Sequence, residues 1–226
     1  MKIGLLIIAT NKYVSFLTDL IPSADEFFLK GENVEYFIFS DHKSLSIKSS
    51  RVVNLLHTDH KQWPWMTLGR YKMFSDNSAS FKDMDYLFYC DADMRFCDNI
   101  GEEILGDRTA TQHPGFYGRR GTPETNPNSL AYVAQVEQMQ YFAGGFNGGK
   151  KEEYLKMSKV LSENIDKDFE NEIIAIWHDE SHLNRYFASN TPTVVLDPGY
   201  CYGESLKPPF HPRLIALDKN HKDLRV

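Results

Sequence analysis

Continuous runs of apolar residues recur in the first half of the chain and predict buried strands. They cover Ile3 to Ala9, Val34 to Phe39, Val52 to Leu56 and Tyr86 to Cys90. Runs that are apolar on both faces, without polar alternation, are typical of strands covered by helices on both sides. We therefore expect these segments to form one central sheet with parallel strands.

Stretches with helical periodicity separate and follow these strands. Apolar residues keep a helical spacing from Tyr13 to Leu20, before Pro22, and the stretch from Met66 to Phe74 contains only Gly69 as a breaker. In the second half we expect helices at Lys151 to Asn164, Glu170 to Trp177 and Glu180 to Phe187, and a short strand at Thr193 to Leu196. The pattern predicts an α/β fold with a mixed, mostly parallel sheet.

The length and composition fit one folded unit. The 226 residues are 42% hydrophobic and 13% aromatic, enough to bury one sizeable core, so we predict a single domain over residues 1–226. A polar stretch from Gly118 to Ser129, GRRGTPETNPNS, is rich in turn-forming residues and has apolar sequence on both sides. We interpret it as a mobile loop within the domain.

Charge and cysteine content restrict the partners and the compartment. The 25 Lys and Arg against 31 Asp and Glu give a net charge of -6, which disfavours nucleic acid as a partner. Three cysteines without C-x-x-C spacing predict neither a disulfide framework nor a zinc site. The apolar start from Ile3 to Ala9 is too short to span a bilayer and lacks a cleavage site, so we expect a soluble, cytoplasmic protein.

A first pair of carboxylates, Asp91 and Asp93, directly follows the apolar run Tyr86 to Cys90. This position is the carboxyl end of a predicted strand, where open α/β sheets bind ligands. Two hard oxygen donors there can hold Mg²⁺ or Mn²⁺, with diphosphate oxygens and water in the remaining positions. Such a metal would neutralise a diphosphate leaving group.

Two other interpretations of this D-x-D string stay open on the residues alone. Aspartate is common in the turn after a strand, where it bonds to the local backbone. Phosphohydrolases of the haloacid dehalogenase type also use a D-x-D after a buried strand, with the first Asp as nucleophile. They need a later acidic pair for the metal, which has no convincing counterpart in this chain.

A second cluster, Trp177 to Asn184 with the sequence WHDESHLN, packs two acids, two imidazoles and an indole into one short segment. This density favours a functional site around Asp179 and Glu180. A helix amino terminus is the structural alternative, since both acids would favour its dipole. His178 and His182 do not form H-E-x-x-H, which argues against zinc.

A glycine-rich segment and the tryptophans provide weaker signals. Gly144 to Gly149, GGFNGG, lets a backbone approach a ligand closely, although glycine content alone favours a tight structural turn. Trp63, Trp65 and Trp177 can stack on a sugar face, but tryptophans are more often part of a core.

The ordered set of motifs resembles glycosyltransferase family 6, which contains the histo-blood-group A and B transferases and the α-1,3-galactosyltransferase. The resemblance covers nearly the whole chain and rests on TNKYVSFL from Thr10, Arg70-x-x-Met73, YCDADMRF from Tyr89, HPGFYG from His113, AGGFNGG from Ala143, WHDESHLN from Trp177 and DKNH from Asp218. It implies one catalytic domain over 1–226 with the UDP-sugar-binding α/β fold called GT-A. It also implies retaining transfer of Gal or GalNAc to the 3-hydroxyl of a galactose.

The resemblance implies a role for each matching residue on the donor side. Glu180 matches the essential glutamate below the anomeric carbon, as nucleophile or as a stabiliser of oxocarbenium charge. Asp91 and Asp93 would contact Mn²⁺ or Mg²⁺ and the diphosphate. The remaining donor contacts would come from Tyr13 at uridine, Arg70 at phosphate or sugar, Lys219 at the diphosphate, Asp179 at sugar hydroxyls, and the Gly144 and Gly145 backbone.

The acceptor and the sugar preference follow from the same resemblance. His113 and Trp177 would shape the acceptor pocket, and Ala143 replaces a larger residue, which makes room for a fucosylated galactose. Gly145 stands where GalNAc enzymes of the family keep glycine and galactose enzymes place alanine. We therefore expect UDP-GalNAc as donor, with UDP-Gal as the alternative.

Departures from the family pattern set the remaining expectations. The membrane anchor and stem of animal members are missing, which indicates a bacterial or phage-type enzyme. Bacterial members commonly carry Asn at both D-x-D positions and work without metal, and Glu204 stands near the place of an acceptor-contacting aspartate. We also expect the Gly118 to Ser129 loop and the basic tail to close over UDP. A carbohydrate-binding module without catalysis is the non-enzymatic alternative.

Overall fold

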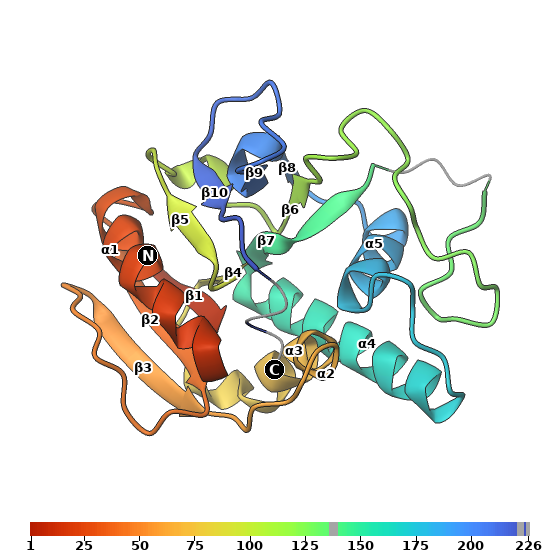
Figure 1. The fold of residues 1–226 in the computed structure, drawn as a ribbon, viewed down its shortest axis with the longest axis horizontal. Coiled ribbons are helices and arrows are strands. Elements are labelled where there is room, and N and C mark those ends of the chain that lie inside the picture. The colour runs from red at the N-terminus through yellow and green to blue at the C-terminus, as the bar shows by residue number, and fades with distance from the viewer. Residues whose placement is uncertain (136–139, 221–223, 225–226) are drawn as a thin grey trace.

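A central sheet of seven strands, in the order β3-β2-β1-β4-β7-β6-β8, organises the computed structural model, which describes residues 1–135, 140–220 and 224 (Figure 1). The first four strands are β1 (Lys2–Ile8), β2 (Asn33–Ser40), β3 (Val52–His57) and β4 (Tyr86–Cys90). They pair in parallel, as the apolar runs predict. Their carboxyl ends therefore meet at one edge of the sheet.

The second half of the chain completes the sheet with strands of both directions. β7 (Phe142–Lys150) runs antiparallel to β4 and to β6 (Arg108–Gln112), whereas β8 (Val194–Leu196) pairs with β6 in parallel. The mixed, mostly parallel sheet and the short strand ending at Leu196 are both confirmed. β6 has the sequence RTATQ, and its lack of an apolar run explains why the pattern does not predict it.

A second, three-stranded sheet contains β5 (Met94–Phe96), β10 (Leu214–Ala216) and β9 (Tyr202–Gly203), in that order. It attaches the end of the chain to the end of β4. The Leu217 N–H donates to the Asp93 carbonyl at 2.9 Å, directly after β10. Lys219 and Asp93 thereby come together although 126 residues separate them.

Helices cover both faces of the central sheet (Figure 1). One face packs against η1 (Asn11–Phe16), α1 (Leu17–Phe27) and the small sheet, and the other against α2 (Trp65–Leu68), α3 (Arg70–Asp76), α4 (Lys151–Glu170) and α5 (Asp179–Ser189). Short 3₁₀ turns are η2 (Ser78–Phe81), η3 (Glu102–Ile104) and η4 (Pro198–Cys201). Within the described ranges, no helix is long and apolar enough to cross a membrane.

The helices agree with the predicted periodicity at most positions. α2 and α3 are separated only at Gly69, as expected, and α4 and α5 extend the predicted segments. α1 continues through Pro22 to Phe27 instead of ending before the proline. Burial of Leu20, Ile21 and Ala24 against the sheet explains why the helix persists there.

The predicted helix from Glu170 to Trp177 is wrong. α4 ends at Glu170, and Glu172 adopts a left-handed φ of 58°. The Ile173 N–H then donates to the Asp168 carbonyl at 2.8 Å, a bond that closes the end of the helix. Ile174 and Ile176 are exposed, so the apolar residues of this segment do not pack against the core as those of a helix would.

The interpretation of Gly144 to Gly149 as a tight turn is also wrong, because these residues belong to β7. At the carboxyl end of β7, the far end from the pocket, close packing leaves no room for side chains at Gly148 and Gly149. A Cβ on Gly148 would lie 2.2 Å from Phe88 Cδ1, and one on Gly149 would lie 2.2 Å from the Asp107 carbonyl. The missing side chains let β7 fit between β4 and β6.

Candidate active site

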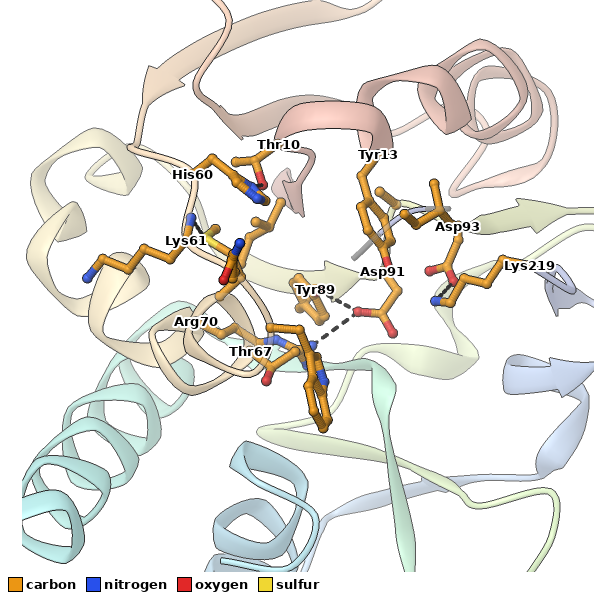
Figure 2. Close-up of a pocket in the computed structure, with 16 residues that line it drawn as sticks. Thr10, Tyr13, His60, Lys61, Thr67, Arg70, Tyr89, Asp91, Asp93 and Lys219 are labelled. Carbon is orange, nitrogen blue, oxygen red and sulfur yellow. Dashed lines mark hydrogen bonds and ion pairs between the residues drawn. The ribbon is translucent and has the colours of Figure 1, made fainter. Parts of the chain in front are cut away.

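A pocket opens at the carboxyl edge of the sheet, where the chain order changes direction between β1 and β4 (Figure 2). Such a change of direction leaves a crevice in which open α/β sheets bind ligands. Thr10 and Tyr13 follow β1, Asp91 and Asp93 follow β4, and all four line the pocket. The structure therefore brings two pairs of residues that are far apart in the chain into one site.

Arg70, in the first turn of α3, is the centre of this site. Its side chain is only 7% exposed, and its Nη2 lies 3.1 Å from Asp91 Oδ1 while Nη1 lies 3.2 Å from Asp179 Oδ2. Nη1 also donates to the Gly144 carbonyl at 2.8 Å. The guanidinium stacks 4.1 Å from the centre of the Tyr89 ring. One buried cation thus joins β4, β7 and α5.

The electrostatics of Arg70 follow from these contacts. Burial alone would lower the pKa of Arg70, but Asp179, followed by Tyr89 and Asp91, raises it well above its ordinary value. Arg70 stays charged and compensates the neighbouring acids. Tyr89 completes the arrangement, because its hydroxyl donates to Asp91 Oδ1 at 2.5 Å (Figure 2).

Asp93 and Lys219 form a second ion pair beside the first. Burial raises the pKa of Asp93, and the neighbouring Asp91 adds to this effect, whereas Lys219 opposes it. The ammonium group of Lys219 also lies 5.4 Å from the centre of the Tyr13 ring. Tyr13, Asp93 and Lys219 therefore line the same side of the pocket (Figure 2). The rest of the predicted basic tail lies mostly outside the described residues, as does His221 of the DKNH motif.

Asp179 and Glu180 begin α5 after a strained turn. The preceding residue, His178, has φ 54° and ψ -126°, a conformation that suits glycine and costs a side chain on the order of 1 kcal/mol or more. The turn directs the side chains of Asp179 and Glu180 toward β7. The Gly144 N–H donates to Glu180 Oε2 at 2.8 Å, so the helix-start and site interpretations of this cluster hold together.

Burial sets the protonation of these two acids. It raises the pKa of Asp179 to about 6, with Arg70 opposing the shift. It also raises the pKa of Glu180 to about 7, against the hydrogen bond from Gly144 and the nearby Tyr141 hydroxyl. Glu180 therefore changes its charge near neutral pH, whereas an exposed glutamate would be fully ionised.

The first glycines of β7 keep the backbone open beside the charged groups. A Cβ on Gly144 would face Arg70 Nη1 at 3.4 Å and Glu180 Oε2 at 3.5 Å. One on Gly145 would lie 3.1 Å from Asp91 Oδ2. Ala143, next to them, is buried. Gly144 and Gly145 therefore lie directly beside the carboxylates of Glu180 and Asp91.

The residues expected at the acceptor lie around Tyr141, the residue before β7. The His113 ring is 5.7 Å from the Tyr141 ring, and the Tyr141 hydroxyl lies beside Glu180. Burial lowers the pKa of His113 to about 4, so its ring is neutral. Trp177 is half exposed, and its Nε1 donates to Thr122 Oγ1 at 2.8 Å. Residues predicted to bind the donor and residues predicted to bind the acceptor therefore both lie near Glu180.

Three residues of the site lie outside the sequence predictions. Tyr89 contacts both Asp91 and Arg70, Tyr141 lies between His113 and Glu180, and His60 bonds to Thr10 at 2.9 Å through Nδ1. Tyr89 ends an apolar run and resembles a core residue, although it is the first residue of the motif YCDADMRF. Tyr141 lies two residues before AGGFNGG, and this position is the signal that could have pointed to it.

The donor set permits a divalent cation without forming a complete metal site. Asp91 Oδ1 accepts from Tyr89 and Arg70, and Asp93 Oδ2 accepts from Lys219, so these contacts use one oxygen of each carboxylate. In the part of the chain that is described, no cluster of three or more His, Cys, Asp or Glu could hold a metal. The residues therefore fit Mn²⁺ or Mg²⁺ only together with diphosphate oxygens and water.

The mixed sheet and the pocket at its carboxyl edge are those of a GT-A type glycosyltransferase domain. A family model described as Glycosyltransferase family 6 matches residues 1–226. Histo-blood group ABO system transferase 1 of Rattus norvegicus is 37% identical over 237 residues, covering 99% of this chain and 68% of the relative. Globoside alpha-1,3-N-acetylgalactosaminyltransferase 1 of Homo sapiens is 33% identical over 234 residues, covering 99% and 67%.

A bacterial protein also matches over almost its full length. O-antigen biosynthesis glycosyltransferase WbnI of Escherichia coli is 24% identical over 227 residues, covering 98% of this chain and 97% of the relative. The chain belongs to glycosyltransferase family 6. It is accordingly a hexosyltransferase, and its substrates are a nucleotide-sugar donor and a glycan acceptor.

The raised pKa of Glu180 makes stability depend on pH. Between about pH 4.5 and 7 the folded protein binds more protons at Glu180 than the unfolded chain, so its stability falls as pH rises through this window. Glu180→Gln removes this loss. We expect the difference in melting temperature, variant minus parent, to be several degrees larger at pH 8 than at pH 5. This change corresponds to on the order of 1–3 kcal/mol in the free energy of unfolding.

Thermal unfolding of both proteins at several pH values measures this difference. Glu163→Gln, at an exposed position of α4, serves as the control and should show no such change. If the melting temperatures of Glu180→Gln and the parent differ by the same amount at pH 5 and pH 8, the raised pKa of Glu180 is contradicted.

Proposed function

We propose that this protein transfers GalNAc from UDP-GalNAc, with retention of configuration, to the 3-hydroxyl of a fucosylated galactose. One observation carries the proposal. Glu180 is a half-buried carboxyl that accepts the Gly144 N–H, next to the Gly144 carbonyl that binds Arg70, and Tyr141 lies between it and the acceptor candidate His113. A group that handles charge at the anomeric carbon needs this position between the two substrates.

The donor would lie along the pocket between β1 and β4. The Tyr13 ring offers a stacking surface for the uracil base, and the Lys219 ammonium group, 5.4 Å from that ring, is within reach of a diphosphate attached to the nucleoside. Arg70 supplies a buried positive charge at the sugar end, where the bond breaks. A diphosphate in this pocket would therefore meet two cations.

The chemistry requires three events at the anomeric carbon. Its bond to the diphosphate oxygen breaks, and the electron pair leaves with UDP, whose negative charge Arg70 and Lys219 stabilise. The 3-hydroxyl oxygen of the acceptor forms the new bond on the same face, and its proton passes to a departing phosphate oxygen. Ionised Glu180 stabilises the positive charge on the sugar, either as a covalent nucleophile or electrostatically.

The choice of sugar rests on the open backbone of β7. The space that a Gly145 side chain would fill lies next to Asp91, so glycine leaves room for an N-acetyl group near the diphosphate. Ala143 leaves further room for a branched acceptor. Asp179, held by Arg70, is in position to accept hydrogen bonds from sugar hydroxyls, and Trp177 offers an exposed indole for a sugar ring.

We further propose that Asp91 and Asp93 hold Mn²⁺ or Mg²⁺ together with the UDP diphosphate. Bound there, the cation would supply neutralisation of the leaving diphosphate. The raised pKa of Asp93, caused by burial and by Asp91, indicates excess negative charge that a cation would relieve. Arg70 and Lys219 already provide part of this compensation.

Transfer of galactose from UDP-Gal remains the second candidate, because the same pocket accommodates the smaller sugar. The phosphohydrolase and the carbohydrate-binding module have less support. Family membership favours glycosyl transfer, and Asp91 Oδ1 accepts hydrogen bonds from Arg70 and Tyr89, which makes it a poor nucleophile.

The reaction is tested by release of UDP in the presence of a fucosyl-galactoside. We expect the parent protein to release UDP from UDP-GalNAc and to form an α-1,3-linked product, identified by NMR. Glu180→Gln should lower kcat by about 10³-fold or more because charge stabilisation at the anomeric carbon is lost. Full activity of this variant, with loss of activity in Asp91→Asn alone, would instead favour a phosphohydrolase; sugar binding without UDP release would favour a binding module.

The sugar preference is tested by adding one methyl group to β7. Gly145→Ala should lower the ratio of kcat/KM for UDP-GalNAc over UDP-Gal by about 10-fold or more, because the methyl group occupies the space proposed for the acetamido group. Ser80→Ala, at an exposed position, is the control. Faster turnover of UDP-Gal than of UDP-GalNAc by the parent protein would contradict the donor assignment.

The metal is tested by chelation and by direct binding. We expect EDTA to suppress UDP release, added Mn²⁺ to restore it, and the EPR signal of free Mn²⁺ to fall only when UDP is present, because the protein offers two carboxylates alone. Asp93→Asn should weaken this binding by about 10-fold or more. Exposed Asp83→Asn should not change it. Undiminished UDP release in EDTA would exclude the metal.

A further inference from the structure

The loop from Gly118 to Ser129 has a specific attachment to the segment before Glu180. Glu124 is buried, with 6% of its surface exposed. Its Oε1 accepts the N–H groups of Thr125 at 2.8 Å and Asn126 at 2.7 Å, and its Oε2 accepts the Ile176 N–H at 2.7 Å. One carboxylate therefore joins the loop to the turn that precedes α5.

A second carboxylate fixes the other end of the same loop. Asp168, at the end of α4, accepts the Ser129 hydroxyl at 2.5 Å and the Leu130 N–H at 2.8 Å. The loop also closes on itself, since the Val133 N–H donates to the Glu124 carbonyl at 3.1 Å. These bonds give the loop a defined shape, anchored at two buried acids.

The segment that Glu124 holds contains the strained residue of the site. His178 has φ 54°, and relaxing this conformation would rotate Asp179 and Glu180 relative to β7. Three side chains hold the turn from outside its own backbone: Glu124 through the Ile176 N–H, Thr122 through Trp177 Nε1 and Ser181 through the Trp177 N–H. Two of the three come from the loop.

We propose that Glu124 is a positioning residue that keeps the strained turn at His178 in place, and that the loop acts as a brace for the acceptor side of the site. The inference rests on the proposed transfer reaction. Because Trp177 lies directly before His178 and Glu180 lies two residues after it, Glu124 fixes the acceptor platform relative to the reacting carbon. Loosening the turn lets water compete with the acceptor hydroxyl, while the uridine pocket between β1 and β4 stays intact.

Glu124→Gln is the sharpest test because it keeps the shape of the side chain. A carboxamide has one accepting oxygen, so it can bond either to the loop N–H groups or to the Ile176 N–H, but not to both. We expect acceptor KM to rise by about 10-fold, hydrolysis to take a larger share of the UDP released, and donor KM to stay within about twofold. Hydrogen exchange of the segment 173–180 should become about 10-fold faster or more.

Matched variants separate positioning from stability. Asp168→Asn weakens the other anchor of the loop and its contact with His182 but keeps the Glu124 bond to the Ile176 N–H, so it should lower the melting temperature and raise the share of hydrolysis less than Glu124→Gln does. If Glu124→Gln does not fold, Thr122→Val removes the bond to Trp177 alone and should raise acceptor KM in the same direction. Glu163→Gln again controls for the loss of an acid.

The outcomes distinguish this inference from the proposed function. Hydrogen exchange needs no substrate, so unchanged exchange at 173–180 in Glu124→Gln overturns the brace whether or not the protein is active. A parent protein that releases no UDP overturns the transfer reaction instead. An active parent whose Glu124→Gln variant keeps its acceptor KM and its share of hydrolysis also overturns the brace.

Discussion

The buried guanidinium of Arg70 is the interaction on which the rest of the site depends. Its partners come from the end of β4, from the backbone of β7 and from the start of α5. Burying the Asp179 carboxylate next to the partly exposed Asp91 would be unfavourable without a cation, and burying the cation would be unfavourable without these acids. The three elements are therefore mutually dependent, and the carboxyl edge of the sheet takes its shape from a balance of charge as much as from apolar packing.

The sequence predicts those parts of the fold in which one pattern dominates. The parallel strands β1, β2 and β4 are mostly buried apolar runs, so they are visible without structural context. β3 has a similar apolar run but lies at the sheet edge, where Val52 and Val53 are exposed. β6 and β7 carry no such signal: one is polar and small, and the other is rich in glycine because Phe88 and the 107–108 backbone pack against it. The wrong helix before Trp177 covers a segment whose Ile174 and Ile176 are exposed.

The charged members of the candidate site are visible in the sequence because acids, glycines and aromatics gather in short motifs. What the sequence does not contain is their relation in space. Nothing near Arg70 indicates that it pairs with Asp91 and Asp179, and nothing near Glu124 indicates that it reaches Ile176, because each contact joins elements far apart in the chain. Tyr89 and Tyr141 are hidden by their apolar neighbours. Tertiary contacts of this kind need the fold.

Strand β7 divides into halves with different tolerance for change. At its far end, a side chain on Gly148 would penetrate Phe88, and one on Gly149 would meet a backbone carbonyl. At its near end, side chains on Gly144 and Gly145 would come within 3.1–3.5 Å of Arg70, Glu180 and Asp91, which are charged groups of the candidate site. The two ends of the strand are therefore restricted for different reasons. A side chain added at the near end acts first on the site, whereas one added at the far end acts first on the packing of the sheet.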